Sequence, residues 1–335
     1  MIFKLFLVFI FTIVILRLVK KFLIFHNFTG EKHQIFLNSK KIPLVGGIIL
    51  CFALLICFET KYLYVYLFLI SIFLLGLFSD LKKISSPILR FILQFSIVLF
   101  FVNLMDLKIN PLSFYFLDIF LNNSNFNFFF TSFCILIILN GSNFLDGLNN
   151  LVIGYFIIIS FSLKYLAYQG FLISSIFVLD YLILVLTLLF ILNFFNKIYL
   201  GDSGAYLLSI FFSIILIDFY NLNSDNISPF FIVLLLWYPA FENFFSILRK
   251  IIFNFSPVKP DTFHLHQQIY KFLYYKFNKS SVVTNTLTGN LINVYNSMLI
   301  LIGIHKISSD SFQIILVLIS IIFYIFLYIR LIKKN

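Results

Sequence analysis

The stretch FNFFFTSFCILIILNGSNFLDGLNNLVIGYFIIISFSL, residues 126–163, decides how this chain folds. Two apolar runs, 126–142 and 151–163, flank a short polar segment that holds one carboxylate, one glycine and three amides. A helix needs about 20 apolar residues to cross a bilayer, and each run extends to nearly that length. The pattern therefore predicts two membrane-spanning helices joined by a polar loop, Asn143–Asn150, whose purpose the rest of the sequence has to explain.

The composition of the whole chain points to lipid surroundings. Of its 335 residues, 61% are hydrophobic and 11% are charged, whereas a soluble globular protein carries about 25% charged residues. One soluble core could not bury this much apolar surface, which excludes an ordinary water-soluble domain. The three cysteines, Cys51, Cys57 and Cys134, lie in apolar runs and are interpreted as small core residues rather than disulfide partners or metal ligands.

Polar breaks divide the chain into about eleven apolar segments that can form transmembrane helices. These segments cover 2–22, 44–58, 62–78, 88–105, 127–141, 151–167, 171–192, 204–221, 228–245, 290–304 and 311–330. We therefore expect an all-α, polytopic integral membrane protein with a single transmembrane domain over residues 1–335. The first segment lacks a small-residue cleavage site and is expected to span rather than to be removed. Residues 107–126 are too polar to span and are expected at the membrane interface.

The basic residues predict the orientation of the chain in the membrane. With the N-terminus outside and the C-terminus in the cytoplasm, most of the 24 lysines and arginines fall in cytoplasmic loops, the largest of which is 246–289. The basic residues on the other side are Lys4, Lys61, Lys108, Lys164 and Lys306. This asymmetry explains the net charge of +11 better than nucleic-acid binding does, so we expect the lipid bilayer and no nucleic acid as a partner.

The polar residues gather in five loops on the predicted cytoplasmic face. These loops read KKIPLVGG (40–47), GLFSDLKKISSP (76–87), NGSNFLDGLNN (140–150), NKIYLGDSGAY (196–206) and ILRKIIFNFSPVKPDTFHLHQQ (247–268). Asp80, Asp146 and Asp202 lie at span ends, where they can face a polar cleft. Three converging acids repel one another unless a cation joins them, and Mg²⁺ accepts carboxylate and phosphate oxygens. The pattern indicates a metal-assisted phosphate site.

Each motif also has a purely structural interpretation. Asp146 and Asp202 could cap helices, and the Gly46-Gly47 pair could permit close helix contact. His264 and His266 could begin a zinc site, but no Cys or third His is spaced to complete one. Arg249 could simply orient the chain. Two further acids, Asp180 and Glu242, fall in or near predicted spans and are expected to pair or to face a cavity, although the sequence does not name their partners.

Taken together and in order, PLVGG, G-x-x-x-D, N-x-x-D-G, GDSG and H-x-H resemble the signature loops of the polyprenyl-phosphate N-acetylhexosamine-1-phosphate transferases. That superfamily includes phospho-N-acetylmuramoyl-pentapeptide transferase, and the resemblance covers roughly residues 40–268. It implies a single catalytic domain that transfers a sugar 1-phosphate from a UDP-N-acetylhexosamine to undecaprenyl phosphate and releases UMP. It further implies the bacterial inner membrane, an active site on the cytoplasmic face, Mg²⁺ or else Mn²⁺ as cofactor, and leaves a homodimer open.

The resemblance also implies roles for individual residues. The catalytic residues would be Asp80, Asp146 and Asp202, and the metal would be held by Asp202 and Asp146. The substrate-binding residues would be Lys41, Gly46, Gly47, Ser79, Asn143, Arg249, His264 and His266. The loop Ile42–Gly47 and the short histidine motif are similar to the branch that starts surface polysaccharides such as O-antigen, teichoic acid or capsule, so UDP-GlcNAc is the expected donor.

The sequence departs from the pattern of this family at four places. Ser79-Asp80 replaces two adjacent aspartates, Gln267 replaces a further histidine, Thr262 replaces the arginine of P-D-R, and Asn150 replaces the second glycine of D-G-x-x-G-L. Ser79 keeps a hydrogen bond but loses a charge. A catalytically inactive relative, a membrane transporter and a metal-dependent membrane hydrolase therefore remain the alternatives to an active transferase.

Overall fold

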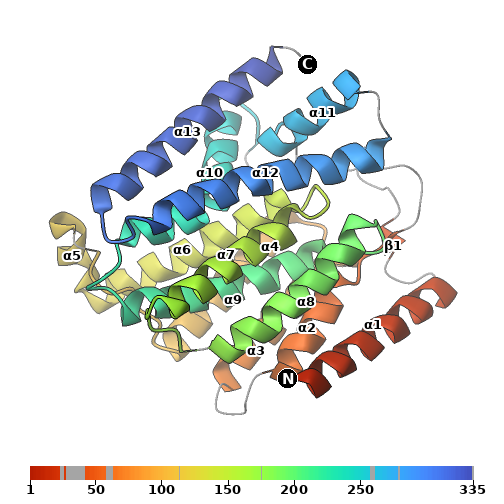
Figure 1. Cartoon of the computed structure of the whole chain (residues 1–335), viewed down its shortest axis with the longest axis horizontal. Coiled ribbons are helices and arrows are strands. Elements are labelled where there is room, and N and C mark those ends of the chain that lie inside the picture. Colours follow the sequence, from red (N-terminus) through yellow and green to blue (C-terminus); the bar gives the residue numbers. More distant parts are fainter. Residues whose placement is uncertain are drawn as a thin grey trace.

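The computed structural model describes residues 1–22, 26–27, 42–57, 63–112, 114–174, 176–256, 261–277 and 280–333 (Figure 1). The helices are α1 (Ile2–Phe22), α2 (Gly46–Cys57), α3 (Leu63–Asp80), α4 (Pro87–Leu104), α5 (Tyr115–Leu121), α6 (Ser124–Leu145), α7 (Leu151–Tyr168), α8 (Ile176–Phe194), α9 (Gly201–Leu222), α10 (Pro229–Ile252), α11 (Leu265–Phe277), α12 (Ser281–Ile304) and α13 (Asp310–Ile332). A short antiparallel strand pair, β1 (His26–Asn27) and β2 (Ile42–Pro43), completes the described part. Lys41 lies outside the described residues.

The expectation of an all-α, polytopic membrane protein is confirmed. Nine of the described helices are long and apolar enough to cross a membrane, and α2 and α8 are shorter apolar helices. Each of the eleven predicted spans coincides with one of these helices. The short helix α5 lies in the polar segment expected at the interface, at the left end of the helix assembly in Figure 1, while β1 lies at the right end.

The predicted loop 246–289 contains more helix than hydropathy indicates. Helix α10 continues to Ile252, α11 lies within the segment, and α12 begins at Ser281 rather than at residue 290. The first half of α12 is rich in Ser, Thr and Asn, which conceals it from a hydropathy rule. Thr284, Asn285 and Thr288 are nevertheless buried, and the side chain of each takes part in a hydrogen bond.

Helix α9 is the centre of the assembly. Most of its residues are buried, on all sides of the helix, whereas α1 and α13 are largely exposed. Helices α2, α3 and α6 pack closely around α9. The approach of α3 requires Gly76, because a Cβ built there would lie 2.4 Å from the Cα of Ser203. A helix that is apolar on every side is expected in the interior of a bundle.

The segment before α9 joins the start of α2 through the backbone. The N–H groups of Gly46 and Gly47 donate to the carbonyls of Tyr199 and Leu200, both at 3.0 Å. A Cβ on Gly47 would lie 2.3 Å from Oγ of Ser203. The glycine pair thus permits a close contact between backbones, as its structural interpretation predicts. This contact holds the N-terminus of α2 beside the N-terminus of α9.

Asp180, for which the sequence named no partner, forms an ion pair within the bundle. Its carboxylate on α8 lies 2.6 Å from Nζ of Lys164 on α7. A charged group in a membrane-spanning helix is costly unless it is paired. The two residues therefore pair with each other, and the pair links neighbouring helices.

Replacement of Gly76 by Ala tests the central packing. The added methyl group has no room against Ser203, so we expect Gly76→Ala to lower the stability of the detergent-solubilised protein by about 1–3 kcal/mol, as overpacking generally does. Leu74→Ala on the same helix is the control, because Leu74 is exposed and should change the thermal midpoint little. Equal midpoints for the two variants would contradict this packing.

Candidate functional site

Asp80, the last residue of α3, holds the start of α9. Its Oδ1 accepts the backbone N–H of Asp202 at 2.8 Å, and its Oδ2 accepts the backbone N–H of Ser203 at 3.1 Å and the hydroxyl of Ser203 at 2.6 Å. The first N–H groups of a helix have no partner within the helix, so Asp80 acts as a cap supplied by another helix. Gly201 makes room for it: its φ is +77°, and a Cβ there would lie 2.8 Å from Oδ2 of Asp80.

Asp202 is held by a different pair of side chains. Its Oδ2 accepts the hydroxyl of Ser79 at 2.6 Å and an Nη1 hydrogen of Arg90 at 2.9 Å. Arg90 also donates to the hydroxyl oxygen of Ser79 at 2.8 Å. Ser79 therefore links Arg90 to Asp202. The transferase family that the sequence resembles has a second aspartate at the position of Ser79. The carboxylate of Asp202 is about one-quarter exposed, so it remains accessible to a ligand.

Arg90 is not among the candidate site residues predicted from the sequence, where it counts only as one of the cytoplasmic basic residues. A usable signal was present, because Arg90 lies in the first turn of the helix that follows Asp80 and so begins at the same end of the bundle. An arginine near three predicted acids is a natural ion-pair partner.

Asp146 completes the group of acids. It follows the last residue of α6, and its carboxylate accepts the backbone N–H of Gly201. Burial, together with the nearby charges of Asp202 and Asp80, raises the pKa of Asp146 well above its ordinary value. The structure thus brings Asp80, Asp146 and Asp202 together, and we call these three residues the aspartate cluster.

A network of amides fixes the loop that carries Asp146. The side chain of Asn285 on α12 accepts the backbone N–H of Asn149 at 2.6 Å, and that of Asn193 on α8 accepts the backbone N–H of Asn150, also at 2.6 Å. Asn293 donates to the carbonyl of Asn150 at 2.8 Å. These contacts explain why the polar half of α12 is buried, and they tie the loop to two helices distant in sequence.

Asn150 occupies a left-handed backbone conformation, with a φ of 65°. The transferase family that the sequence resembles has the second glycine of D-G-x-x-G-L at this position. Asn is among the non-glycine residues that adopt this conformation most readily, so the substitution preserves the turn. The side-chain amide of Asn150 is buried and has no hydrogen-bond partner within the described residues, so its backbone rather than its side chain holds the loop.

The other side of the same loop contacts the histidine motif. The rings of Phe144 and His264 lie 5.2 Å apart between centroids, and a Cβ on Gly147 would lie 3.2 Å from Nε2 of His266. The loop Asn143–Asn150 therefore lies between the aspartate cluster and the histidines. Asn143 itself lies in the last turn of α6, and its carbonyl accepts the N–H of Asp146 at 3.2 Å.

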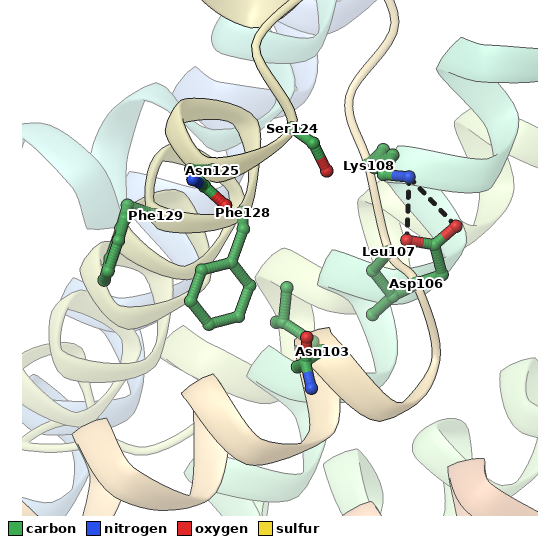
Figure 2. A pocket seen from close by; sticks show the side chains of 9 residues that line it. Asn103, Asp106, Leu107, Lys108, Ser124, Asn125, Phe128 and Phe129 are labelled. Atoms are coloured by element: carbon green, nitrogen blue, oxygen red, sulfur yellow. Dashed lines mark hydrogen bonds and ion pairs between the residues drawn. The ribbon is translucent and has the colours of Figure 1, made fainter.

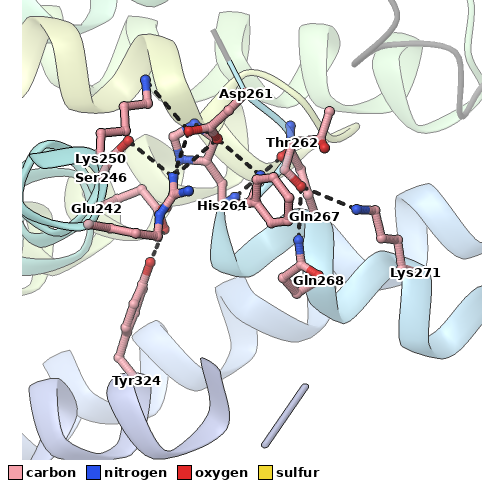
Figure 3. Close-up of polar contacts among 12 residues, drawn as sticks. Glu242, Ser246, Lys250, Asp261, Thr262, His264, Gln267, Gln268, Lys271 and Tyr324 are labelled. Carbon is pink, nitrogen blue, oxygen red and sulfur yellow. Dashed lines mark hydrogen bonds and ion pairs between the residues drawn. The ribbon is translucent and has the colours of Figure 1, made fainter. Parts of the chain in front are cut away.

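His264 and His266 have different surroundings, although their rings stack at 5.5 Å between centroids. Nδ1 of His264 lies 2.8 Å from Oε1 of Glu242, and its Nε2 lies 3.8 Å from Oδ1 of Asp261 (Figure 3). His266 is fully buried, and neither ring nitrogen has a hydrogen-bond partner in the described part of the chain. Burial lowers the pKa of His266 to about 3, so this ring is neutral at pH 7.

Arg249, in the last turn of α10, is paired with Asp261, which lies between α10 and α11. Its Nη2 donates to both carboxylate oxygens of Asp261, at 3.1 and 2.9 Å, and Lys250 lies 3.6 Å from that carboxylate (Figure 3). Burial acts to raise the pKa of Asp261, but His264, the N–H of Phe263 and the two basic residues together hold it below its ordinary value. We call Glu242, Arg249, Asp261, His264 and His266 the histidine cluster.

A cavity of about 410 Å³ lies at the opposite end of the bundle, between the end of α4 and the start of α6 (Figure 2). Asp106 and Lys108 at its edge pair with each other at 2.8 Å. The full lining is Val102, Asn103, Asp106, Leu107, Lys108, Ser124, Asn125, Phe128 and Phe129. This set shares no residue with the predicted site, so the cavity does not compete with the aspartate cluster as the place of reaction.

Comparison with known proteins gives matches over the region that carries the aspartate cluster. The sequence model of glycosyl transferase family 4 matches residues 62–220. Over 251 residues the chain is 26% identical to the probable undecaprenyl-phosphate N-acetylglucosaminyl 1-phosphate transferase of Bacillus subtilis (strain 168), which covers 70% of this chain and 67% of that protein. Over 236 residues it is 27% identical to the undecaprenyl-phosphate alpha-N-acetylglucosaminyl 1-phosphate transferase of Thermotoga maritima, covering 68% of each chain.

Two substitutions at Asn150 distinguish the contribution of its left-handed backbone conformation to stability from the contribution of its side-chain amide. Asn150→Gly should fold with no loss of stability, because it keeps the left-handed turn and removes a buried, unpaired amide. Asn150→Ala should be less stable by about 1–2 kcal/mol, the cost of a left-handed alanine. Thermal unfolding in detergent measures both, and a glycine variant less stable than the alanine variant would contradict the assignment.

The crowding of acids predicts that Asp146 lowers stability in the protein without divalent cations. A folded-state pKa raised above the unfolded value means that ionised Asp146 destabilises the fold increasingly as the pH rises through that interval. Asp146→Asn should therefore raise the thermal midpoint at pH 7 in EDTA, with a smaller gain as the pH falls toward the ordinary range of a carboxylic acid. Asp225→Asn, in the exposed turn after α9, is the control. A lower midpoint for Asp146→Asn would overturn the prediction.

Proposed function

We propose that this chain, which matches the sequence model of glycosyl transferase family 4 over residues 62–220, transfers GlcNAc-1-phosphate from UDP-GlcNAc to undecaprenyl phosphate and releases UMP. Its relatives in Bacillus subtilis and Thermotoga maritima are named as undecaprenyl-phosphate N-acetylglucosaminyl 1-phosphate transferases, which supports undecaprenyl phosphate as the acceptor and N-acetylglucosamine as the sugar. The product would begin the membrane stage of a surface polysaccharide.

One observation carries the proposal: the aspartate cluster and the histidine cluster meet at the loop Asn143–Asn150. Both reactants are anions, so a transferase has to neutralise charge and align two phosphates. The aspartate cluster offers carboxylates for a cation, and Arg90 lies beside it. The histidine cluster contributes Arg249 and His264, which can donate to phosphate oxygens. In this arrangement the loop Asn143–Asn150 connects the two halves of the site.

The residues present fit a magnesium ion shared with the substrate. Mg²⁺ is usually held by one or two carboxylates together with substrate phosphates, rather than by a complete protein cage. Asp146 and Asp202 provide two carboxylates, and the raised pKa of Asp146 marks a place where negative charge is crowded. No group of three or more His, Cys, Asp or Glu side chains that could hold a metal occurs among the described residues. A bound Mg²⁺ would supply neutralisation of the diphosphate oxygens.

The chain's own residues then have defined tasks. Asp80 keeps the start of α9 in place, so that Asp202 faces the site. The lipid phosphate has a second pKa near 6 and is mostly dianionic at pH 7, so its attack requires no strong base. One of its oxygens bonds to the β-phosphorus of the UDP-sugar while the bond from that phosphorus to the bridging oxygen breaks. The bridging oxygen leaves with the electron pair as part of UMP.

We place the protein in the bacterial cytoplasmic membrane, with the site on the cytoplasmic face. The support is the distribution of basic residues, since Lys82, Lys83, Arg90, Arg249 and Lys250 all lie at the end of the bundle that carries the aspartate cluster. Short basic loops favour the cytoplasmic side.

The test is UMP release by the purified full-length protein from a panel of UDP-N-acetylated sugars, with undecaprenyl phosphate and Mg²⁺ each present or omitted. We expect UMP release only when both are present. In Asp202→Asn the rate of release should fall at least about 100-fold, because the substitution removes a carboxylate that would hold the cation that neutralises the phosphates. Asp225→Asn is the matched control, since it makes the same change in the exposed turn after the other end of α9.

The remaining outcomes identify the alternatives. UMP release without the lipid phosphate would indicate a hydrolase. No release from a folded sample, while an active relative works in parallel, would indicate an inactive relative or a transporter, and Ser79→Asp would then be the first change to make. Equal rates in the two aspartate variants would refute the assigned site.

A further inference from the structure

Glu242 is a buried carboxylate with two specific partners. It is 1% exposed and lies on α10. Its Oε2 accepts the hydroxyl of Tyr324 on α13 at 2.9 Å, and its Oε1 lies 2.8 Å from Nδ1 of His264 (Figure 3). One oxygen therefore faces a neutral donor and the other faces a ring that can carry a positive charge.

The surroundings exclude water from this pair. The ring of Tyr324 packs against Phe241 at 4.9 Å and Phe245 at 5.1 Å between centroids. A carboxylate in so apolar a place is costly unless a cation and hydrogen bonds compensate it. The hydroxyl of Tyr324 provides a hydrogen bond but no charge, and the ring of His264, 2.8 Å from the other oxygen, can supply the compensating positive charge.

The other charged and titratable groups around His264 are neutral or are paired elsewhere, so the imidazole of His264 is the group placed to act as the cation for Glu242. On α10, Arg249 and Lys250 are both directed at Asp261. On α11, His266 is neutral and stacks on His264. The α6 side contributes the uncharged ring of Phe144, and α13 contributes Tyr324 and, further along, Tyr328. His264 itself has a carboxylate at each ring nitrogen, Glu242 at 2.8 Å and Asp261 at 3.8 Å.

We infer that Glu242 and Tyr324 are positioning residues that hold His264 as an imidazolium, with its Nδ1–H donated to Glu242 and its Nε2–H directed toward the substrate phosphates. The inference rests on the proposed function and deepens it. Tyr324 aligns the carboxylate, the carboxylate orients and charges the ring, and the free edge of the ring presents a fixed N–H donor beside Asp261. A carboxylate behind a histidine is a general means of fixing its tautomer and orientation.

Two tyrosines on α13 provide a matched pair for the test. Tyr328 lies one turn after Tyr324, and its ring also packs on Phe245, at 4.7 Å between centroids. Its hydroxyl is buried and has no hydrogen-bond partner among the described residues. Tyr324→Phe and Tyr328→Phe therefore remove the same group from the same helix, and only the first removes a contact to Glu242.

The experiment combines kinetics with the protonation state of His264. The full-length protein, labelled with ¹⁵N-histidine, is studied in detergent micelles, and His264→Gln assigns the signal. We expect wild-type His264 to show the shifts of a doubly protonated ring at pH 7, and Glu242→Gln to show a neutral ring. For Glu242→Gln, kcat with UDP-GlcNAc should fall about 10–100-fold, the usual effect of losing such a supporting group. Glu242→Asp should recover part of the loss, Tyr324→Phe should show a smaller loss, and Tyr328→Phe should match the wild type.

The outcomes separate this inference from the proposed function. A neutral His264 in the wild-type protein, or a folded Glu242→Gln variant with unchanged kcat, would overturn the inference. A loss of stability without any change in the His264 signal would also overturn it, since the pair would then be only structural. If Glu242→Gln does not fold, a lower kcat in Tyr324→Phe than in Tyr328→Phe supports the inference and equal values overturn it. Should the wild type transfer no sugar but still show the predicted protonation change, the proposed function fails and the positioning stands.

Discussion

The carboxylate of Asp80 on the first N–H groups of α9 is the interaction on which the site depends. It joins the end of one membrane helix to the start of the most buried one. Because α9 begins there, Gly201 can donate to Asp146 and Asp202 can turn toward Ser79 and Arg90. Without that cap, the N-terminus of α9 would lack partners in an apolar setting, where unpaired N–H groups are costly.

The loop Asn143–Asn150 uses this anchor to connect two sets of charges that are distant in sequence. Asp146 lies against the start of α9, while Phe144 and Gly147 lie against the histidines. The amides that follow are tied to α8 and α12 by hydrogen bonds from several asparagines. The loop is therefore rigid in the physical sense that its backbone groups have specific partners, which suits a site that has to align two phosphates.

Hydropathy predicted the spans well because lipid-facing and core-facing helices are both apolar, and the order of the loops predicted which acids would converge. Hydropathy failed where polar residues are buried: the first turns of α12 read as a loop, although Asn285 within them holds the loop that carries Asp146. Partners such as Arg90 for Asp202 and Tyr324 for Glu242 come from other helices, so no local spacing reveals them. Two departures from the expected family pattern have physical explanations: Asn150 keeps a left-handed turn, and Ser79 links Asp202 to an arginine.

We propose that Asp146 and Asp202 share a divalent cation while Asp80 remains the cap of α9. The most direct measurement is anomalous diffraction at the manganese edge from crystals of the full-length protein soaked with Mn²⁺ and UDP-GlcNAc. We expect a manganese peak within about 2–2.5 Å of carboxylate oxygens of Asp146 and Asp202, with Asp80 still accepting from the N–H groups of Asp202 and Ser203. A peak bound by Asp80 with α9 uncapped, or a peak remote from Asp146, would contradict it.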